Sequence, residues 1–135
     1  MNKLFRRGAI GTLAIAMIAG AALSFPAAIA ANDRDVIREG NCTGASDWKI
    51  KQSPENGRIE VEFEVDSNRA GQTWNVRLKK NGNTFFQGQR TTGARSGSFE
   101  VRRVVNNGAG SETIVGRAVN PSTGEVCRGE VTANL

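Results

Sequence analysis

Short runs in which apolar and polar residues alternate fill most of the chain after residue 42. In the clearest run, 59–66, one Ile, two Val and one Phe alternate with three Glu and one Asp. Successive side chains of a β-strand point to opposite faces, so this period of two predicts strands with one buried face. Runs of this kind predict seven strands, near residues 47–52, 59–66, 74–79, 83–89, 98–102, 112–120 and 125–133.

Seven short strands in about 100 residues are typical of an antiparallel β-sandwich, in which two sheets bury their inner faces against each other. No helical period stands out after the first 30 residues, although 33–38 are compatible with one short helical turn. The expected fold is a single all-β domain over 43–135, preceded by a lead-in segment over 31–42.

The first 30 residues have the three parts of a secretory signal peptide. Three cations in the first seven residues precede an apolar run over 8–30, and Ala-Ile-Ala at 28–30 supplies the small residues of a cleavage site. We expect cleavage near Ala30 and a secreted bacterial protein without a stable membrane anchor. An uncleaved anchor is the alternative, since the run is long enough to span a bilayer. The sequence leaves export by the Sec or the twin-arginine route open.

The charge of the chain depends on this leader. The whole chain has 18 Lys and Arg against 13 Asp and Glu. Three of the cations precede residue 8, which leaves 15 against the same 13 and a formal charge of +2. A near-neutral domain with interspersed charges does not indicate a nucleic-acid-binding protein.

Cys42 and Cys127 are the two cysteines of the chain, and they lie near the two ends of the strand-rich segment. Outside the cytosol such a pair is expected to form a disulfide. The bridge would close a loop of about 86 residues and stabilise the fold by about 4–5 kcal/mol in the chain-entropy model. A redox or metal-binding thiol would need a neighbouring His or a CxxC motif, and the chain has neither.

Turn residues predict how neighbouring strands pair. A five-residue connection over 53–57 places Ile50 opposite Val61, and Lys51 opposite Glu60 on the other face. This register sets apolar residues against apolar ones and cations against carboxylates, as sheets favour.

The Asn-Gly pair at 81–82 is the strongest hairpin signal, because it suits a two-residue type I′ turn. In the simplest register Leu78 faces Phe85 inward and Arg77 faces Phe86 outward. A bulged turn would exchange the two Phe residues. Alternatively, Phe86 tucks under a loop at the sheet edge.

The predicted hairpin formed by the last two strands has valines in an unexpected position. Pairing Val119 with Val126 sets Ala118 against Cys127. If Cys127 faces the interior, valines lie on the outer face, where an antiparallel sheet normally shows polar residues. Either something covers this surface, or the bridge lies at the sandwich edge and the two faces are reversed. The outer row would consist of Val115, Arg117, Val119, Val126, Arg128 and Glu130.

The carboxylates of 60–66 do not indicate a metal site. Calcium needs oxygen ligands that converge on one point, whereas alternate residues of a strand spread along a face. We therefore expect neither a metal nor another cofactor.

The layout resembles the immunoglobulin-like and fibronectin type III-like sandwiches. Trp74 in the third predicted strand, the run 114–120 and the hairpin to Val126 and Cys127 carry the resemblance, which covers about 43–134. The resemblance implies an architecture and no activity. It is incomplete, because antibody domains bridge their second and sixth strands and the chain has no Tyr for a tyrosine corner.

These observations favour a non-catalytic function. The chain has no His and no Tyr, so the usual general base is absent. We expect a binding module that uses the outer face of one sheet, formed by the third, fourth, sixth and seventh predicted strands, to bind an extracellular protein. Apolar residues with arginines are typical of interfaces. The alternative is a structural or self-associating envelope component, a homodimer through the same face. The candidate residues are Arg77, Phe86, Val115, Arg117, Val119, Val126 and Arg128.

Overall fold

The computed structural model describes residues 34–135, and every regular element among them is a β-strand. This part of the chain contains no helix with the length and hydropathy of a membrane span. The expected signal peptide and its cleavage site near Ala30 lie outside the described residues. The strands are β1 (Val36–Asn41), β2 (Asp47–Glu55), β3 (Arg58–Asp66), β4 (Thr73–Lys80), β5 (Asn83–Thr91), β6 (Ser98–Val105), β7 (Glu112–Val119) and β8 (Val126–Ala133).

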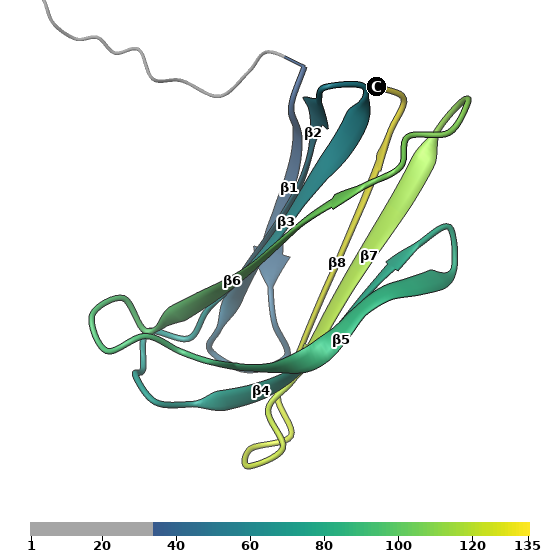
Figure 1. Cartoon of the computed structure of the whole chain (residues 1–135). Helices are drawn as coiled ribbons and strands as arrows, with labels where there is room; N and C mark the ends of the chain where they lie inside the picture. The colour runs from purple at the N-terminus through teal and green to yellow at the C-terminus, as the bar shows by residue number, and fades with distance from the viewer. Residues whose placement is uncertain (1–33) are drawn as a thin grey trace, which may run out of the picture. The chain divides into compact units, whose positions relative to one another are not determined.

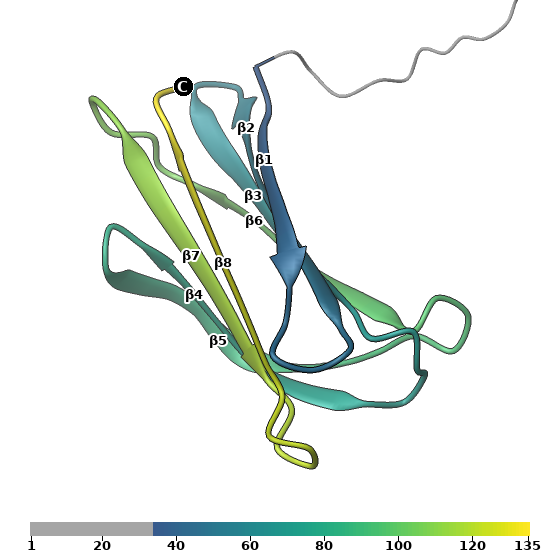
Figure 2. The same ribbon diagram turned by 180° about the vertical axis from the view of Figure 1, so that it is seen from behind.

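The strands form two four-stranded antiparallel sheets, with the orders β1-β2-β3-β6 and β5-β4-β7-β8. The two sheets face each other (Figures 1 and 2). Fully buried side chains from both sheets form one cluster, with Ile50 and Phe63 from the first sheet and Trp74 and Leu78 from the second. This is the sandwich-like all-β architecture that the alternating pattern predicted.

The strand count of seven was wrong, because the described residues form eight strands. The additional strand is β1, in a segment where the sequence allowed a short helical turn. β1 is an edge strand that pairs only with β2, and most of its side chains are exposed. A strand without a buried face has no apolar alternation, so its sequence carries no period-two signal.

The β2–β3 hairpin has the predicted faces, but the predicted register was wrong by two residues. Its turn is the dipeptide Asn56-Gly57, with φ angles of 50° and 78°, instead of a five-residue connection. Ile50 therefore pairs with Phe63 and not with Val61. Positive φ at both turn residues is the type I′ geometry that matches the twist of a hairpin. A shift of two residues keeps every side chain on its predicted face.

The β4–β5 hairpin contains a β-bulge. Lys80 pairs with Asn83 as predicted, but the register shifts after Leu78, which lies opposite Phe86 and not Phe85. The simplest predicted register was therefore wrong beyond the turn. A bulge does exchange the two phenylalanines, although it lies within the strands and not in the turn itself.

The β7–β8 hairpin has the predicted register throughout. Ala118 pairs with Cys127, and Ile114 pairs with Val131. All four side chains are buried, with Cys127 completely inaccessible. The row that contains Cys127 therefore faces the core, and the valine and arginine row faces outward.

The predicted disulfide between Cys42 and Cys127 is present, with an S–S distance of 2.02 Å and a Cα–Cα distance of 4.3 Å. Beside it, the N–H of Thr43 donates to the carbonyl of Val126 at 2.9 Å. These links tie the end of β1 to the start of β8, which belong to different sheets. The bridge is consistent with an oxidising, extracytosolic environment.

Glycines make room for aromatic rings between the sheets. A Cβ atom at Gly129 would lie 2.5 Å from the Trp48 ring, and one at Gly40 would lie 2.6 Å from the other side of that ring. In the same way, a Cβ at Gly116 would lie 2.7 Å from the Phe63 ring. Side chains at these positions would collide with the rings. Gly129 and Gly116 therefore allow the two sheets to approach closely, and Gly40 leaves room for Trp48 beside it in the same sheet.

Candidate binding face

The outer face of the β5-β4-β7-β8 sheet carries nearly all the side chains that the sequence assigned to a binding surface. Inner residues of β7 and β8 are buried, and the alternate residues between them are exposed or half-buried. We call this outer surface the basic face. It includes six of the seven predicted residues, namely Arg77, Val115, Arg117, Val119, Val126 and Arg128.

Three arginines lie side by side across this face. Arg77 of β4 pairs directly with Arg117 of β7, which pairs directly with Arg128 of β8. Adjacent strands are about 4.8 Å apart, and like charges opposite each other on a sheet are destabilising. Arg128 has a counter-ion, because its Nη2 lies 3.1 Å from Glu130 Oε1. Within residues 34–135, no carboxylate lies at ion-pair distance from Arg77 or Arg117.

A pair of valines lies next to the arginine row. Val119 pairs with Val126 across β7 and β8, and both side chains are half-buried. Asn75 of β4 lies opposite Val119 on its other side. The basic face therefore has an apolar pair, at the hairpin end of β7 and β8, beside its guanidinium groups, and the fully buried parts of protein interfaces are enriched in apolar residues and Arg.

A shallow hollow marks the β4–β5 side of the basic face. Its polar lining consists of Asn75, Arg77, Gln87, Gln89 and Arg117. Gln89 Nε2 donates to Asn75 Oδ1 at 3.1 Å, which orients both amides. Guanidinium and amide groups donate hydrogen bonds to carboxylates and other anions, so this hollow is lined by donors of the kind that bind anionic groups.

The two glutamines and Asn75 were not among the predicted site residues. In β5 the inner row is Phe86, Gly88 and Arg90, so both rows of this edge strand contain polar residues. The sequence around them therefore lacks the contrast that would separate an inner row from an outer one.

Phe86 does not lie on the basic face, contrary to the simplest predicted register. It shares the inner face with buried Leu78, at the outer edge of the β5-β4-β7-β8 sheet. The guanidinium carbons of Arg90 and Arg103 lie 4.9 and 4.5 Å from the centroid of its ring. These cation–π contacts half-bury the ring at the sandwich edge.

Charged pairs on the outer face of the other sheet follow the observed register of β2 and β3. Lys51 Nζ lies 3.0 Å from Glu62 Oε2, and Lys49 Nζ lies 3.7 Å from Glu64 Oε1. The predicted partner of Lys51, Glu60, forms an ion pair with Arg102 instead. Among the described residues, no group of three or more His, Cys, Asp or Glu side chains is arranged to hold a metal ion.

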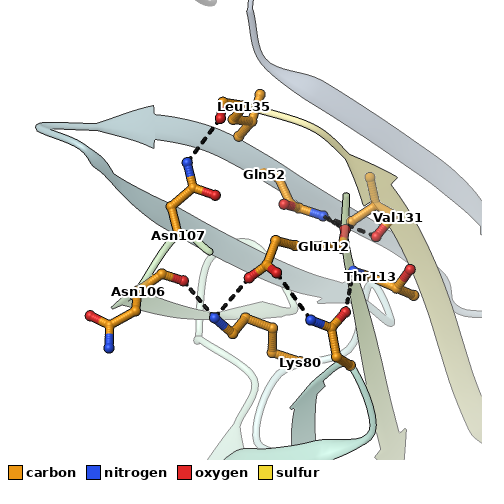
Figure 3. A network of polar contacts seen from close by, with 9 residues as sticks. Gln52, Lys80, Asn106, Asn107, Glu112, Thr113, Val131 and Leu135 are labelled. Carbon is orange, nitrogen blue, oxygen red and sulfur yellow. Dashed lines mark hydrogen bonds and ion pairs between the residues drawn. The ribbon is translucent and has the colours of Figure 1, made fainter. Parts of the chain in front are cut away.

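A buried polar network lies at the end of β8 away from the disulfide (Figure 3). Lys80 Nζ lies 2.8 Å from Glu112 Oε2, and Asn81 Nδ2 donates to Glu112 Oε1 at 3.1 Å. The side chain of Glu112 is only 6% exposed. The hydrogen bond from Lys80, which outweighs the opposing effect of burial, and the one from Asn81 hold the pKa of Glu112 below its usual value.

Gln52 extends this network across the sandwich. Its side chain is completely buried, and Nε2 donates to the carbonyls of Glu112 at 2.9 Å and Val131 at 3.0 Å. A residue of β2 thereby satisfies backbone acceptors of β7 and β8, in the opposite sheet (Figure 3). These two hydrogen bonds link the sheets directly and help to hold them in position.

The chain matches no protein-family model, and no curated protein matches it.

Proposed function

We propose that this protein is a non-catalytic binding module that presents the basic face to a protein partner. The row of Arg77, Arg117 and Arg128 supports this proposal most directly. The three guanidinium groups, on neighbouring strands, repel one another. Among the described residues, only Arg128 of this row has a carboxylate partner. A partner with carboxylates opposite Arg77 and Arg117 would relieve that repulsion.

Export of the module is part of the proposal. A signal peptide cleaved near Ala30 would release the domain outside the cytosol, and the disulfide is consistent with that compartment. The two facing antiparallel sheets also support the proposed structural similarity to immunoglobulin-like and fibronectin type III-like domains. Domains of these two kinds commonly bind other molecules through their exposed surfaces. The architecture therefore suits a binding role, but it does not specify a partner.

The arginine row disfavours a homodimer that joins two copies of the same face. A two-fold contact places the same patch of both copies in one interface. The arginines of one copy would then lie close to those of the other, with Glu130 as the carboxylate of the patch. The basic face is therefore better suited to an acidic surface than to itself.

The test compares wild-type protein with a double variant, Arg117→Ser and Val119→Asp. Biotinylated protein is incubated with culture fluid of the producing organism, and captured proteins are quantified by mass spectrometry. We expect partner capture to fall at least about tenfold, with the thermal midpoint changed by less than about 5 °C, because both side chains lie on an outer face.

Two controls make the result specific. The variant Ile37→Asp, Arg38→Ser makes the same kinds of change on exposed positions of β1, and Phe86→Ala removes the aromatic ring that lies off the basic face. Both should retain capture. If the Arg117→Ser, Val119→Asp variant captured the same proteins as wild type in equal amounts, the proposed face would be wrong.

A further inference from the structure

The outer faces of the two sheets have opposite charge. Opposite the basic face, one end of the β1-β2-β3-β6 sheet carries two adjacent cross-strand rows, Asn41-Asp47-Asp66-Ser98 and Glu39-Lys49-Glu64-Glu100. We call this end the acidic face. Its carboxylates surround a single cation, Lys49, and they are Glu39, Asp47, Glu64, Asp66 and Glu100.

The carboxylates of the acidic face crowd one another as the arginines of the basic face do. Asp47 lies directly opposite Asp66, and Glu64 lies directly opposite Glu100. Partial burial raises the pKa of Glu100, and the nearby carboxylates of Glu62 and Glu64 raise it further. Each outer face therefore holds an excess of one charge that the fold itself leaves uncompensated.

Both faces are also hollowed where the excess charge lies. The acidic hollow is lined by Glu39, Asp47, Glu64 and Asp66, together with Lys49. The hollow of the basic face is lined by Arg77 and Arg117, with Val119 as its apolar element. The charged groups that line the two hollows therefore have an excess of opposite sign on the two sheets.

We propose that the acidic face of one copy docks on the basic face of a second copy. This inference rests on the proposed function, because it names the partner of the basic face. The carboxylates of one molecule would pair with Arg77 and Arg117 of the next and relieve the like-charge repulsion on both surfaces. Because the two faces belong to opposite sheets, the contact is heterologous and joins copies head to tail, into a ring or an open chain depending on the rotation between copies.

The size of the faces sets the expected strength. Four strands spaced about 4.8 Å apart and about eight residues long at about 3.3 Å per residue cover roughly 500 Å² per copy, which is the upper limit for a contact that uses the whole outer surface of a sheet. A contact of roughly 1,000 Å² in total is at the low end of specific interfaces. Association should therefore be weak, and it should depend strongly on ionic strength because exposed charges supply much of it.

The first measurement is sedimentation velocity of the purified, disulfide-intact protein from about 5 to about 500 μM, a range suited to weak association. The weight-average sedimentation coefficient should rise with concentration at about 10 mM salt. At about 1 M salt the Debye length falls from about 30 to about 3 Å, and the rise should disappear. A wild-type protein that stays monomeric at low salt, or associates equally at high salt, overturns the inference.

Charge reversal tests the pairing of the two faces. Arg77→Glu, Arg117→Glu reverses the basic face, and Glu39→Lys, Asp47→Lys, Glu100→Lys reverses the acidic face without touching the Lys49–Glu64 pair. Each variant alone should remain monomeric, because its two faces then have the same sign. An equal mixture should associate again, because the first variant keeps an acidic face and the second keeps a basic one. A mixture that stays monomeric, beside a wild type that associates, excludes this pairing.

The two proposals fail in different ways. If wild type remains monomeric while the Arg117→Ser, Val119→Asp variant loses capture of another protein, the proposed function stands and the second-copy partner is wrong. If that variant also captures as wild type does, the basic face has no binding role and both proposals are wrong. Thermal midpoints of all variants, expected within about 5 °C of wild type, identify any variant that fails to fold.

Discussion

Removal of the disulfide should cost this domain a large share of its stability. The variant Cys42→Ala, Cys127→Ala opens a link between residues separated by 85 positions. The chain-entropy relation for a loop of this length gives a loss of about 4.6 kcal/mol at 25 °C. A domain of this size has a free energy of unfolding of about 5–15 kcal/mol, so the variant should be marginal or only moderately stable.

The location of the bridge adds a structural consequence. Cys127 is completely buried between the sheets, whereas β1 holds to the rest of the domain mainly through β2 on one side. Without the bridge, β1 and the loop after it lose their covalent link to β8. Backbone amides of β1 should therefore exchange with solvent faster than those of β3, which has a neighbouring strand on each side.

Urea denaturation followed by tryptophan fluorescence measures the effect. With an m-value of about 1.5 kcal/mol/M, the midpoint should fall by about 3 M. Reduced wild-type protein is the matched control, because it keeps both cysteine side chains and lacks only the bond. It should agree with the variant to within about 1 kcal/mol. A loss below about 1 kcal/mol in both proteins would refute the entropic reasoning, and a changed m-value would attribute the effect to the denatured state.

Two further changes test the interior of the sandwich. Glu112→Gln removes the charge paired with Lys80 and should lower the free energy of unfolding by about 1–3 kcal/mol at neutral pH. Because the folded-state pKa of Glu112 lies below its usual value of 4.5, this stabilisation is present above that value and is lost as pH falls through the folded pKa. The gap between wild type and variant should therefore close on acidification, and a constant gap would contradict this account. Gly129→Ala drives a methyl group into the Trp48 ring and should cost about 1–3 kcal/mol, whereas Gly93→Ala, whose Cβ would lie 3.6 Å from its nearest neighbour, should be close to neutral. Thermal denaturation of both glycine variants measures the difference, and equal midpoints would show that Trp48 moves aside.

The face of each side chain follows from sequence far better than the pairing of the strands. In the β2–β3 hairpin, an error of two residues left Ile50 in the core and Lys51 outside, because alternation repeats every two residues. The pairing itself depends on which turn forms, and the Asn56-Gly57 turn was not recognised within a longer polar segment. The type of turn therefore changes every cross-strand partner in this hairpin, but it leaves each side chain on its predicted face.

For Phe86, the alternation of apolar and polar residues predicted the wrong face of the sheet. A single bulge after Leu78 moves every later residue of β5 by one position relative to β4, so the predicted faces are exchanged. The local sequence gives no sign of the bulge, because β5 has polar residues on both of its faces. The position of Phe86 then depends on its contacts with Arg90 and Arg103, one of which comes from the opposite sheet.

The sequence by itself determined the all-β class, the disulfide and the outward direction of the β7–β8 valines and arginines, since these depend on local alternation and on one cysteine pair. Only the tertiary structure decided that Arg77 lies beside Arg117, that β1 completes a sheet and that Lys80 meets Glu112. These contacts join strands and loops distant in the chain, and sequence pattern does not specify which strands become neighbours. The charged faces on which the proposed functions depend arise from that pairing.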